Sequence, residues 1–281
     1  MALPTPSSTT TALVTGASSG IGAELARQLA KRGHGVTLVA RRRQRLETLA
    51  DELASTWNVR TEIVTADLSD TAARRAVLEQ VASAGLTVDV LVNNAGFSTS
   101  GPVRGADPDR ELAMVRTDVE AVVDLCTLAV PGMVDRGRGA VLNVASTAAF
   151  QPLPGQAGYG ASKAFVLSYS HALRAELGGT GVTVAVLCPG PVRTEFAETA
   201  GFTREEAEGS LPSVMWLAAA QVARAAVEGL DQGRGVIIPG LANRLGAQFA
   251  YAVPRRLLLP VLARRHPALR ASHRGPGAGA V

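Results

Sequence analysis

Cysteine, aromatic residues and lysine are scarce in this chain. Two cysteines, Cys126 and Cys188, occur among its 281 residues, and both stand in apolar segments without the spacing of metal ligands. We therefore expect buried free thiols, no disulfide framework and no metal site. Aromatic residues make up 4% and hydrophobic residues 47% of the chain. This composition suits Val, Leu and Ala packing in a parallel sheet covered by helices.

The N-terminus lacks the features of a sorting signal. Its first ten residues, MALPTPSSTT, contain neither a basic region nor an apolar stretch, so we expect a cytoplasmic protein without a secretion signal. Residues 1–10 are predicted to be a short disordered arm. The length is compatible with one α/β domain over residues 11–240, followed by a C-terminal extension over residues 241–281.

Basic charge is concentrated in that extension. The whole chain carries +4, and residues 232–281 contain eight arginines and no acidic residue, which leaves −4 for residues 1–231. No nucleic-acid partner is expected. Lysine occurs only as Lys31 and Lys163, so a lysine that completes a motif is harder to dismiss as background.

Short aliphatic segments alternate with helical patterns along the predicted domain. The expected strands are residues 11–14, 36–40, 60–65, 88–92, 140–144, 182–187 and 236–238. The expected helices are residues 21–32, 43–56, 71–83, 110–135, 157–177 and 219–232. This alternation predicts a doubly wound, parallel, Rossmann-like sheet with its ligand at the carboxyl ends of the strands.

The first strand is followed by a glycine-rich turn, TGASSGIG, at residues 15–22. Gly16, Gly20 and Gly22 allow a tight turn and a close approach of the backbone to a pyrophosphate. The helix that begins near Ile21 points its N-terminal N–H groups at that anion. The turn therefore predicts a dinucleotide site.

Ser146, Tyr159 and Lys163 indicate the reaction. Tyr159 and Lys163 are four residues apart and share a helix face, where an ammonium beside a phenol favours the phenolate. A tyrosine, with an ordinary pKa of about 10, can then exchange a proton nearer neutral pH. Ser146 follows a predicted strand and can hold the substrate oxygen. Taken singly, the three residues also fit a turn cap, a packed helix face and a solvated charge.

Together these motifs resemble the short-chain dehydrogenase/reductase family over nearly all of residues 11–240. The glycine turn resembles the family's cofactor motif, residues 93–96 (NNAG) a second motif, and residues 189–194 (PGPVRT) the nicotinamide-side loop. The resemblance implies hydride transfer between a nicotinamide and a carbonyl carbon. Tyr159 is then the general acid/base, Ser146 binds the oxygen, and Lys163 lowers the tyrosine pKa and contacts the ribose.

The resemblance also implies a set of cofactor contacts and an assembly. The implied contacts are Gly16, Ser18, Ser19, Gly20, Ile21, Gly22, Asp67, Leu68, Asn93, Ala95, Gly96, Tyr159, Lys163, Pro189, Gly190, Val192 and Thr194. A homodimer or homotetramer is expected through the long helices.

The second strand indicates which cofactor is bound. It ends in Ala40, Arg41, Arg42 and Arg43, with no acidic residue to accept the ribose hydroxyls of NAD. Arginine suits the 2′-phosphate of NADP. We predict NADP(H), with Arg41 as the main phosphate ligand and Arg42 as a helper, and reduction as the natural direction. The alternative is that these arginines only begin a solvated helix.

Asp118 departs from the family pattern. Counting back thirteen residues from Pro131 places Asp118 where the family usually has an asparagine that holds a water near the active-site lysine. An aspartate lacks the amide donor and adds negative charge near Lys163. Its catalytic role is therefore open, and Asp118→Asn is expected to keep or raise activity.

The substrate is predicted from the segment after Thr194. Residues 195–216 correspond to the family's variable lid and contain Phe196, Phe202, Leu211, Met215 and Trp216, which suit an apolar substrate and also suit core packing. We expect a ketone or aldehyde reductase, with a 3-oxoacyl-thioester (acyl-carrier or coenzyme A) reductase as the enzymatic alternative. A non-catalytic NADP-sensing protein is the alternative of another class.

The extension mixes leucine-rich stretches with paired arginines. Pro254 and Pro260 interrupt it, so it cannot be one straight membrane-spanning helix. It either covers the substrate opening or a subunit interface, lies on an anionic membrane surface, or attracts an acidic carrier protein or a coenzyme A phosphate. Structural packing is the first expectation.

Overall fold

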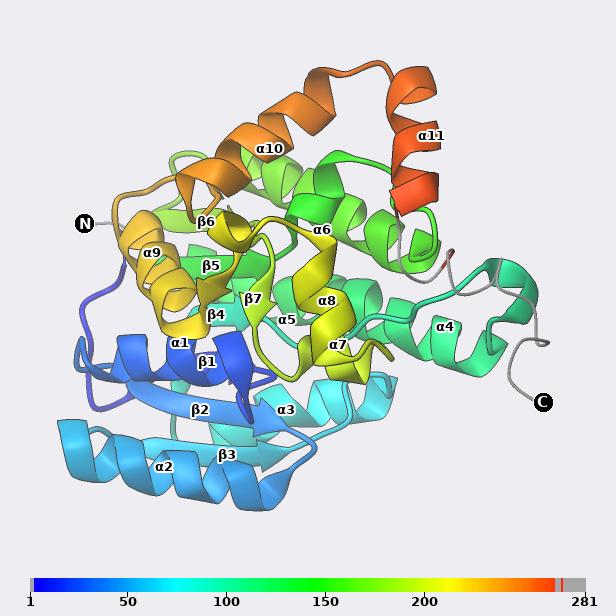
Figure 1. Cartoon of the computed structure of the whole chain (residues 1–281). Helices are drawn as coiled ribbons and strands as arrows, with labels where there is room; N and C mark the ends of the chain where they lie inside the picture. The colour runs from blue at the N-terminus through cyan, green and yellow to red at the C-terminus, as the bar shows by residue number, and fades with distance from the viewer. Residues whose placement is uncertain (1–2, 266–268, 270–281) are drawn as a thin grey trace.

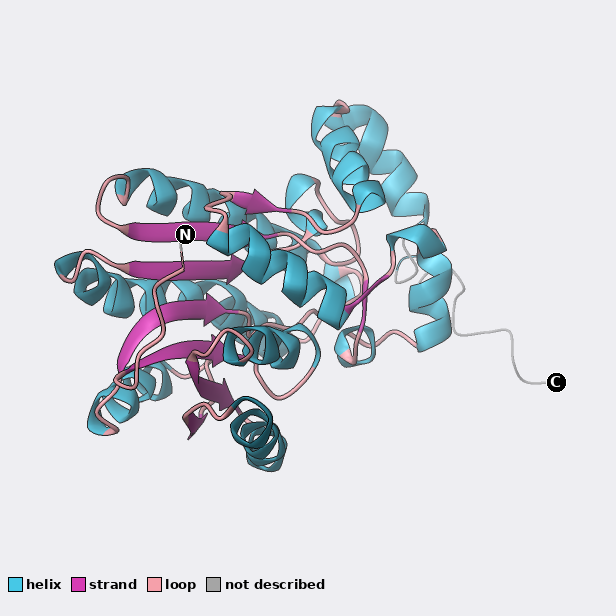
Figure 2. Cartoon of the chain, turned by 90° about the vertical axis from the view of Figure 1, so that its left-hand side faces the viewer, coloured by secondary structure: helices cyan, strands magenta, loops and turns pink. Residues whose placement is uncertain are grey.

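A parallel sheet of seven strands forms the centre of the protein, with helices on both faces (Figures 1 and 2). The structure is a computed structural model that describes residues 3–265 and 269. In sheet order the strands are β3 (Thr61–Thr65), β2 (Gly35–Ala40), β1 (Thr10–Thr15), β4 (Thr87–Asn93), β5 (Gly139–Val144), β6 (Val182–Leu187) and β9 (Val236–Ile237). The order reverses between β1 and β4, and the predicted doubly wound fold is confirmed.

Two helical layers enclose the sheet. One face is covered by α1 (Gly20–Ala30), α2 (Arg43–Trp57) and α9 (Ala219–Asp231), and the other by α3 (Thr71–Ser83), α5 (Ala121–Asp135) and α6 (Ala157–Glu176). Successive residues of a strand pack against opposite helical layers. In β1, for example, Ala12 and Val14 pack with the first layer and Leu13 with the second. Burial on both faces explains why the strands are apolar throughout.

The long helix predicted over residues 110–135 is continuous but not uniform. It consists of α4 (Pro108–Val115), a π-helical turn (Arg116–Glu120) and α5. Pro131 is accommodated inside α5. The π-helical turn carries Asp118, whose side chain is completely buried.

A lid and an extension follow β6. The lid, residues 195–216, contains α7 (Phe196–Thr199) and α8 (Arg204–Ser210). The strands on either side of it, β7 (Val192–Arg193) and β8 (Leu217–Ala218), pair with each other. The extension contains α10 (Leu241–Ala252) and α11 (Arg255–Arg265), with Pro254 between them and Pro260 inside α11. None of the helices described in residues 3–265 is long and apolar enough to cross a membrane.

The N-terminal segment is held against the domain. The sequence analysis expects a disordered arm over residues 1–10, whereas Thr10 begins β1 and residues 3–9 have defined contacts. Leu3 packs against the core, and its N–H donates to Asp231 at the end of α9 at 3.4 Å. The Thr9 carbonyl accepts from the Thr87 N–H at 3.0 Å. Residues 1–2 lie outside the described part of the chain.

Candidate active site

A cavity of about 610 Å³ opens at the carboxyl ends of the strands, where the sheet order reverses. All but two of the predicted site residues line it. They are Gly16, Ser18, Ser19, Gly20, Ile21, Gly22, Arg41, Arg42, Asp67, Leu68, Ala95, Gly96, Ser146, Tyr159, Lys163, Pro189, Gly190, Val192 and Thr194. The two exceptions are Asn93 and Asp118, which lie behind the cavity wall. The structure thus brings motifs that are far apart in the sequence into one site.

The glycine turn shapes the cofactor end of the cavity. Gly16 has φ +65°, and a Cβ atom there would lie 2.8 Å from the Ala95 Cα, so only glycine fits. The turn leads directly into α1, whose first N–H groups and positive dipole end suit a pyrophosphate. The residues present therefore fit a dinucleotide.

Two neighbouring arginines line the same end in different ways. Arg42 donates from Nε and Nη2 to the Ser18 Oγ at 3.1 and 3.0 Å, and from Nη2 to the Ser19 Oγ at 2.7 Å. Arg41 is more exposed, and its Nη1 lies 3.7 Å from the Asp67 Oδ2. Arg42 is thus the arginine that is fixed to the glycine turn. That Arg41 is the main phosphate ligand and Arg42 its helper remains a prediction.

Asn93 steadies the sheet but does not reach the cavity. Its Nδ2 donates to the Asn143 Oδ1 at 2.9 Å, because β4 and β5 pair these residues in register. Asn94, which the sequence analysis does not single out, lines the cavity instead, and its Nδ2 donates to the Thr15 carbonyl at 2.9 Å. Asn94 could have been predicted from the sequence, because it belongs to the same NNAG motif.

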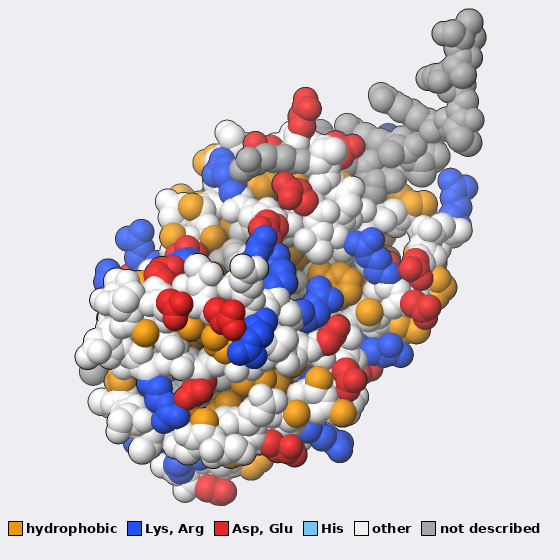
Figure 3. Space-filling model, turned by 90° about the horizontal axis from the view of Figure 1, so that it is seen from below, with side chains coloured by type: hydrophobic (Ala, Val, Ile, Leu, Met, Phe, Trp, Pro, Cys, Tyr) orange, Lys and Arg blue, Asp and Glu red, His pale blue; other side chains and the backbone are white. Residues whose placement is uncertain are grey.

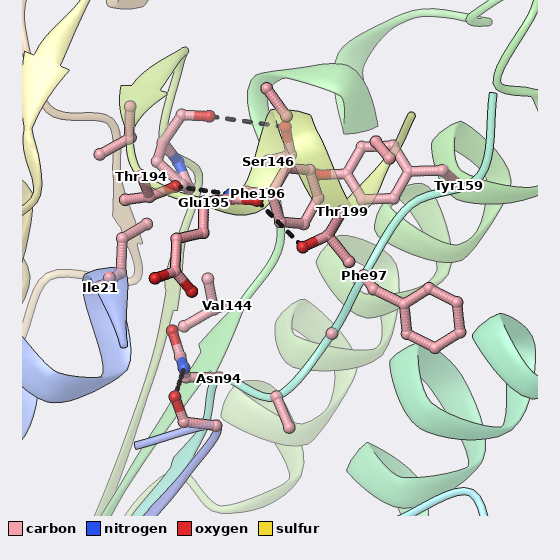
Figure 4. A pocket seen from close by; sticks show the side chains of 18 of the residues that line it. Ile21, Asn94, Phe97, Val144, Ser146, Tyr159, Thr194, Glu195, Phe196 and Thr199 are labelled. Carbon is pink, nitrogen blue, oxygen red and sulfur yellow. Dashed lines mark hydrogen bonds between the residues drawn. The ribbon is translucent and has the colours of Figure 1, made fainter. Parts of the chain in front are cut away.

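Ser146 caps a short helix and also lines the cavity. Its Oγ accepts from the Ala148 N–H at 3.1 Å and thereby caps a short 3₁₀ helix (Thr147–Phe150). The same hydroxyl lines the cavity and lies 3.5 Å from the Pro189 carbonyl oxygen, to which it donates. Figure 4 shows Ser146 close to Tyr159 and Phe196. The turn cap therefore fixes the hydroxyl in place without removing it from the site.

Tyr159 and Lys163 share one face of α6, as predicted. The Lys163 ammonium lies 5.6 Å from the centre of the Tyr159 ring and donates to the Val144 carbonyl at 3.2 Å. Its third neighbour is the Asp118 Oδ2, at 2.9 Å. The other Asp118 oxygen accepts from the Phe97 N–H at 3.0 Å. Asp118 is thus a buried counter-ion of the site lysine.

Burial raises the pKa of Tyr159 above its ordinary value, because it disfavours the charged phenolate. Lys163 and a hydrogen bond with Ser146 lower this pKa, whereas the Asp118 carboxylate raises it further. Lys163 thus acts on the tyrosine in the expected direction, but burial is the larger cause, and in the protein alone the pKa of Tyr159 lies above its ordinary value instead of nearer neutral. Asp118 offsets part of the effect of Lys163, and Tyr159 keeps its proton at neutral pH.

The opposite end of the cavity is apolar. Phe196, Phe202, Leu211 and Trp216 of the predicted lid line it, whereas Met215 does not. The ring of Phe196 packs on that of Tyr159, with centroids 5.6 Å apart. Phe97, Leu153 and Leu262 also line the cavity, as do the polar Gln151 and Gln156, and none of these five was predicted. Leu262 comes from α11, so the extension contributes to the cavity wall.

Glu195, Arg45 and Asn243 were not predicted, because their contacts join distant parts of the sequence. Glu195 of the lid forms ion pairs with Arg42 and Arg45. Asn243 of α10 is completely buried, and its Nδ2 donates to the Met215 and Pro239 carbonyls. No motif in the sequence marks these contacts.

The predicted thiols are buried and free, as expected. Burial raises the pKa of Cys126 and Cys188 to about 12, so neither is a nucleophile near neutral pH. Across residues 3–265, no group of acidic, histidine or cysteine side chains has the arrangement of a metal site.

Comparison with known proteins gives consistent matches. A family profile described as short chain dehydrogenase matches residues 10–205. The NADP-dependent 3-hydroxy acid dehydrogenase YdfG of Salmonella typhi is 38% identical over 224 residues, which span 73% of this chain and 88% of that protein. A solved short-chain dehydrogenase from Sphingobium yanoikuyae in complex with NADPH is 35% identical, with a TM-score of 0.76 over 89% of this chain and 95% of its own.

A second solved structure also matches the extension. The bulky-bulky ketone specific alcohol dehydrogenase from Comamonas testosteroni is 28% identical, with a TM-score of 0.72, and the match covers 98% of both chains.

Proposed function

This chain belongs to the short chain dehydrogenase family, and we propose that it reduces a bulky apolar ketone or aldehyde to the alcohol. It is an NADP(H)-dependent oxidoreductase that acts on CH–OH groups. The observation that carries the substrate proposal is the position of Tyr159. Its buried phenol stands where the glycine-lined end of the cavity meets an apolar end built from Phe196, Phe202 and Leu262.

Tyr159 acts as the proton donor in this proposal. NADPH, when bound, supplies the hydride that reduces the carbonyl carbon. Because the pKa of Tyr159 is raised, its phenol carries a proton at neutral pH and can deliver it to the oxygen of the developing alkoxide. Ser146 donates a second hydrogen bond to that oxygen. Lys163 then stabilises the phenolate that proton transfer leaves behind.

The lid and the extension select the substrate. Aromatic and aliphatic side chains from α7, α8 and α11 surround the space beside Tyr159, and such a lining favours ligands with large apolar groups. The match to a bulky-ketone alcohol dehydrogenase over nearly the whole chain supports this reading. In this proposal the extension covers the substrate opening. Contacts of the extension with a membrane surface or an acyl carrier, and assembly into a dimer or tetramer, remain predictions.

The test is NADPH oxidation, followed by absorbance, with a panel of bulky ketones, aldehydes and 3-oxoacyl thioesters. We expect the bulky ketones to be the best substrates. Tyr159→Phe should lower kcat by at least about 100-fold and leave the NADPH dissociation constant nearly unchanged. Tyr251→Phe, which changes a tyrosine that is 78% exposed on α10, is the matched control.

Each result has a distinct meaning. Turnover of 3-oxoacyl thioesters alone would favour the thioester reductase. Tight NADPH binding without turnover on any substrate would favour a sensor, although Tyr159 and Lys163 are both intact. Full activity of Tyr159→Phe would contradict the proposed chemistry.

A further inference from the structure

The lid carries a carboxylate that contacts the arginines of the cofactor end. Glu195 accepts from the Arg42 Nη1 at 2.9 Å with one oxygen and from the Arg45 Nη1 at 2.8 Å with both. Glu195 and Arg42 both line the cavity. The two arginines lower the pKa of the Glu195 carboxyl, so it is ionised at neutral pH. A negative group of the protein thus lies at Arg42, one of the two arginines where a cofactor phosphate is expected.

The guanidinium of Arg42 binds the glycine turn with one edge and Glu195 with another nitrogen. Nε and Nη2 are bound to Ser18 and Ser19 of the glycine turn, which leaves Nη1 as the nitrogen that meets the lid. Because the two serines already occupy Nε and Nη2, a phosphate that binds Arg42 in this arrangement would have to accept from Nη1. Glu195 and a 2′-phosphate therefore need the same donor, and their negative charges repel each other.

The contact is strong enough to compete but weak enough to break. The side chains of Arg42, Arg45 and Glu195 are each 46–47% exposed, and ion pairs at that exposure contribute little to stability. A phosphate monoester carries nearly two negative charges at neutral pH, so it attracts the arginines more strongly than one carboxylate does. Basic and acidic side chains are mixed over the face of the molecule shown in Figure 3.

The next residue of the lid links this contact to the catalytic side chain. Phe196 follows Glu195, begins α7 and packs on the Tyr159 ring. Figure 4 shows Glu195 directed away from Tyr159 while Phe196 lies beside it. One corner of the lid therefore touches both ends of the cavity.

We propose that Glu195 lowers the preference for NADP(H) by competing with its 2′-phosphate for Arg42, while Arg45 helps to hold Glu195 in place. The inference rests on the proposed function, because it assumes that NADP(H) binds in this cavity. Binding of the phosphate displaces Glu195, and Phe196 moves with it relative to Tyr159. Glu195 thus lowers the affinity for NADPH, whereas NADH, which has no 2′-phosphate, binds without displacing it.

The experiment measures the dissociation constants of NADPH and NADH by fluorescence titration at low salt, with the full chain. Glu195→Gln keeps the size of the side chain and removes its charge. We expect this variant to bind NADPH about three- to tenfold more tightly and NADH within about twofold of the wild type. The difference in NADPH affinity between this variant and the wild type should shrink in about 0.5 M salt, because salt screens the ion pair that competes with the phosphate.

Glu198→Gln is the matched control. Glu198 lies in the same helix and is exposed, but it does not line the cavity. It removes the same charge from the lid, so it reports the general electrostatic effect alone. We expect it to change both dissociation constants by less than about twofold. Thermal unfolding of both variants checks that each is folded.

Three outcomes would overturn the inference. The first is NADPH binding by Glu195→Gln that is weaker than or equal to that of the wild type. Weaker binding would show that Glu195 helps to hold the cofactor, and unchanged binding would show that it is only a surface contact. The second is an equal gain for NADPH and NADH, and the third is the same gain in Glu198→Gln. If wild-type protein binds no NADPH, the proposed function fails as well, which separates that result from the other three.

Discussion

Asp118 sets the electrostatic balance around Tyr159 and Lys163. Its carboxylate is completely buried, 2.9 Å from the lysine, and a Cβ atom at position 96 would lie 2.9 Å from its Oδ1. Gly96 therefore leaves room for the carboxylate in the wall of the cavity. Since Asp118 is one of the causes that raise the Tyr159 pKa, it favours the protonated phenol, which is the form needed for reduction.

Replacing Asp118 by asparagine tests this balance. The amide keeps an acceptor for the Phe97 N–H but removes the negative charge, so the pKa of Tyr159 should fall. Alcohol oxidation requires the phenolate, and its pH–rate profile should therefore shift to lower pH, with activity kept or raised. Asp109→Asn, at an exposed position of α4, is the control. A large loss of activity would show that the carboxylate has a catalytic role of its own.

Site residues could be predicted from the sequence where their chemistry depends on a short, local spacing. Tyr159 and Lys163 lie four positions apart, so helix geometry alone puts them on one face, and Ser146 follows a strand whose carboxyl end faces the cavity. The Asp118–Lys163 and Glu195–Arg42 pairs depend on how distant segments pack. Asp118 was expected near the lysine only through a resemblance, and the effect of burial on the pKa of Tyr159 was not expected.

At the scale of helices and strands, a buried arginine joins α3 to α5. Arg74 is 3% exposed and donates to the Asp124 Oδ2 at 2.8 Å and to the Leu68 carbonyl at 2.9 Å. Leu68 lines the cofactor end of the cavity. The arginine thus holds a helix pair and a stretch of cavity wall in one arrangement.

Asp124→Ala should destabilise the protein by about 2 kcal/mol, because it leaves a buried guanidinium with one partner fewer. Urea unfolding measures the change. Asp51→Ala, at an exposed position of α2, should change the free energy of unfolding by less than about 0.5 kcal/mol. Equal stability of the two variants would show that the Arg74 contact contributes nothing.

Periodicity predicted most elements but not their irregularities. Each of the seven expected strands is present, since aliphatic runs between helices form a buried parallel sheet. The π-helical turn at Arg116–Glu120 leaves no mark on the hydrophobic pattern, because the same face remains buried through it. The short α7, α8, β7 and β8 were not predicted either, since such elements depend on lid packing more than on propensity.

At the scale of the whole molecule, the extension is part of the enzyme's cavity. The boundary drawn at residue 241 from composition remains a prediction, whereas the break that Pro254 predicted does lie between α10 and α11. Pro260 was expected to make another break but lies within α11. Residues 266–281, apart from 269, lie outside the described part of the chain.

Two truncations separate the roles of α10 and α11. Removing residues 254–281 takes Leu262 from the cavity, so KM for bulky ketones should rise by about tenfold while the NADPH dissociation constant stays the same. Removing residues 241–281 also deletes the buried Asn243, and the protein should then lose thermal stability as well. If the shorter truncation leaves KM for bulky ketones unchanged, the extension does not cover the substrate.

Gly190 and Asn243 illustrate how tightly the domain and the extension depend on each other. A side chain at position 190 would collide with the amide of Asn243, which is itself bonded to the carbonyls of Met215 and Pro239. The two positions are therefore expected to covary among relatives. A chimera that received the C-terminal helices of another dehydrogenase would have to exchange this loop and helix together, because neither half of the contact is interchangeable by itself.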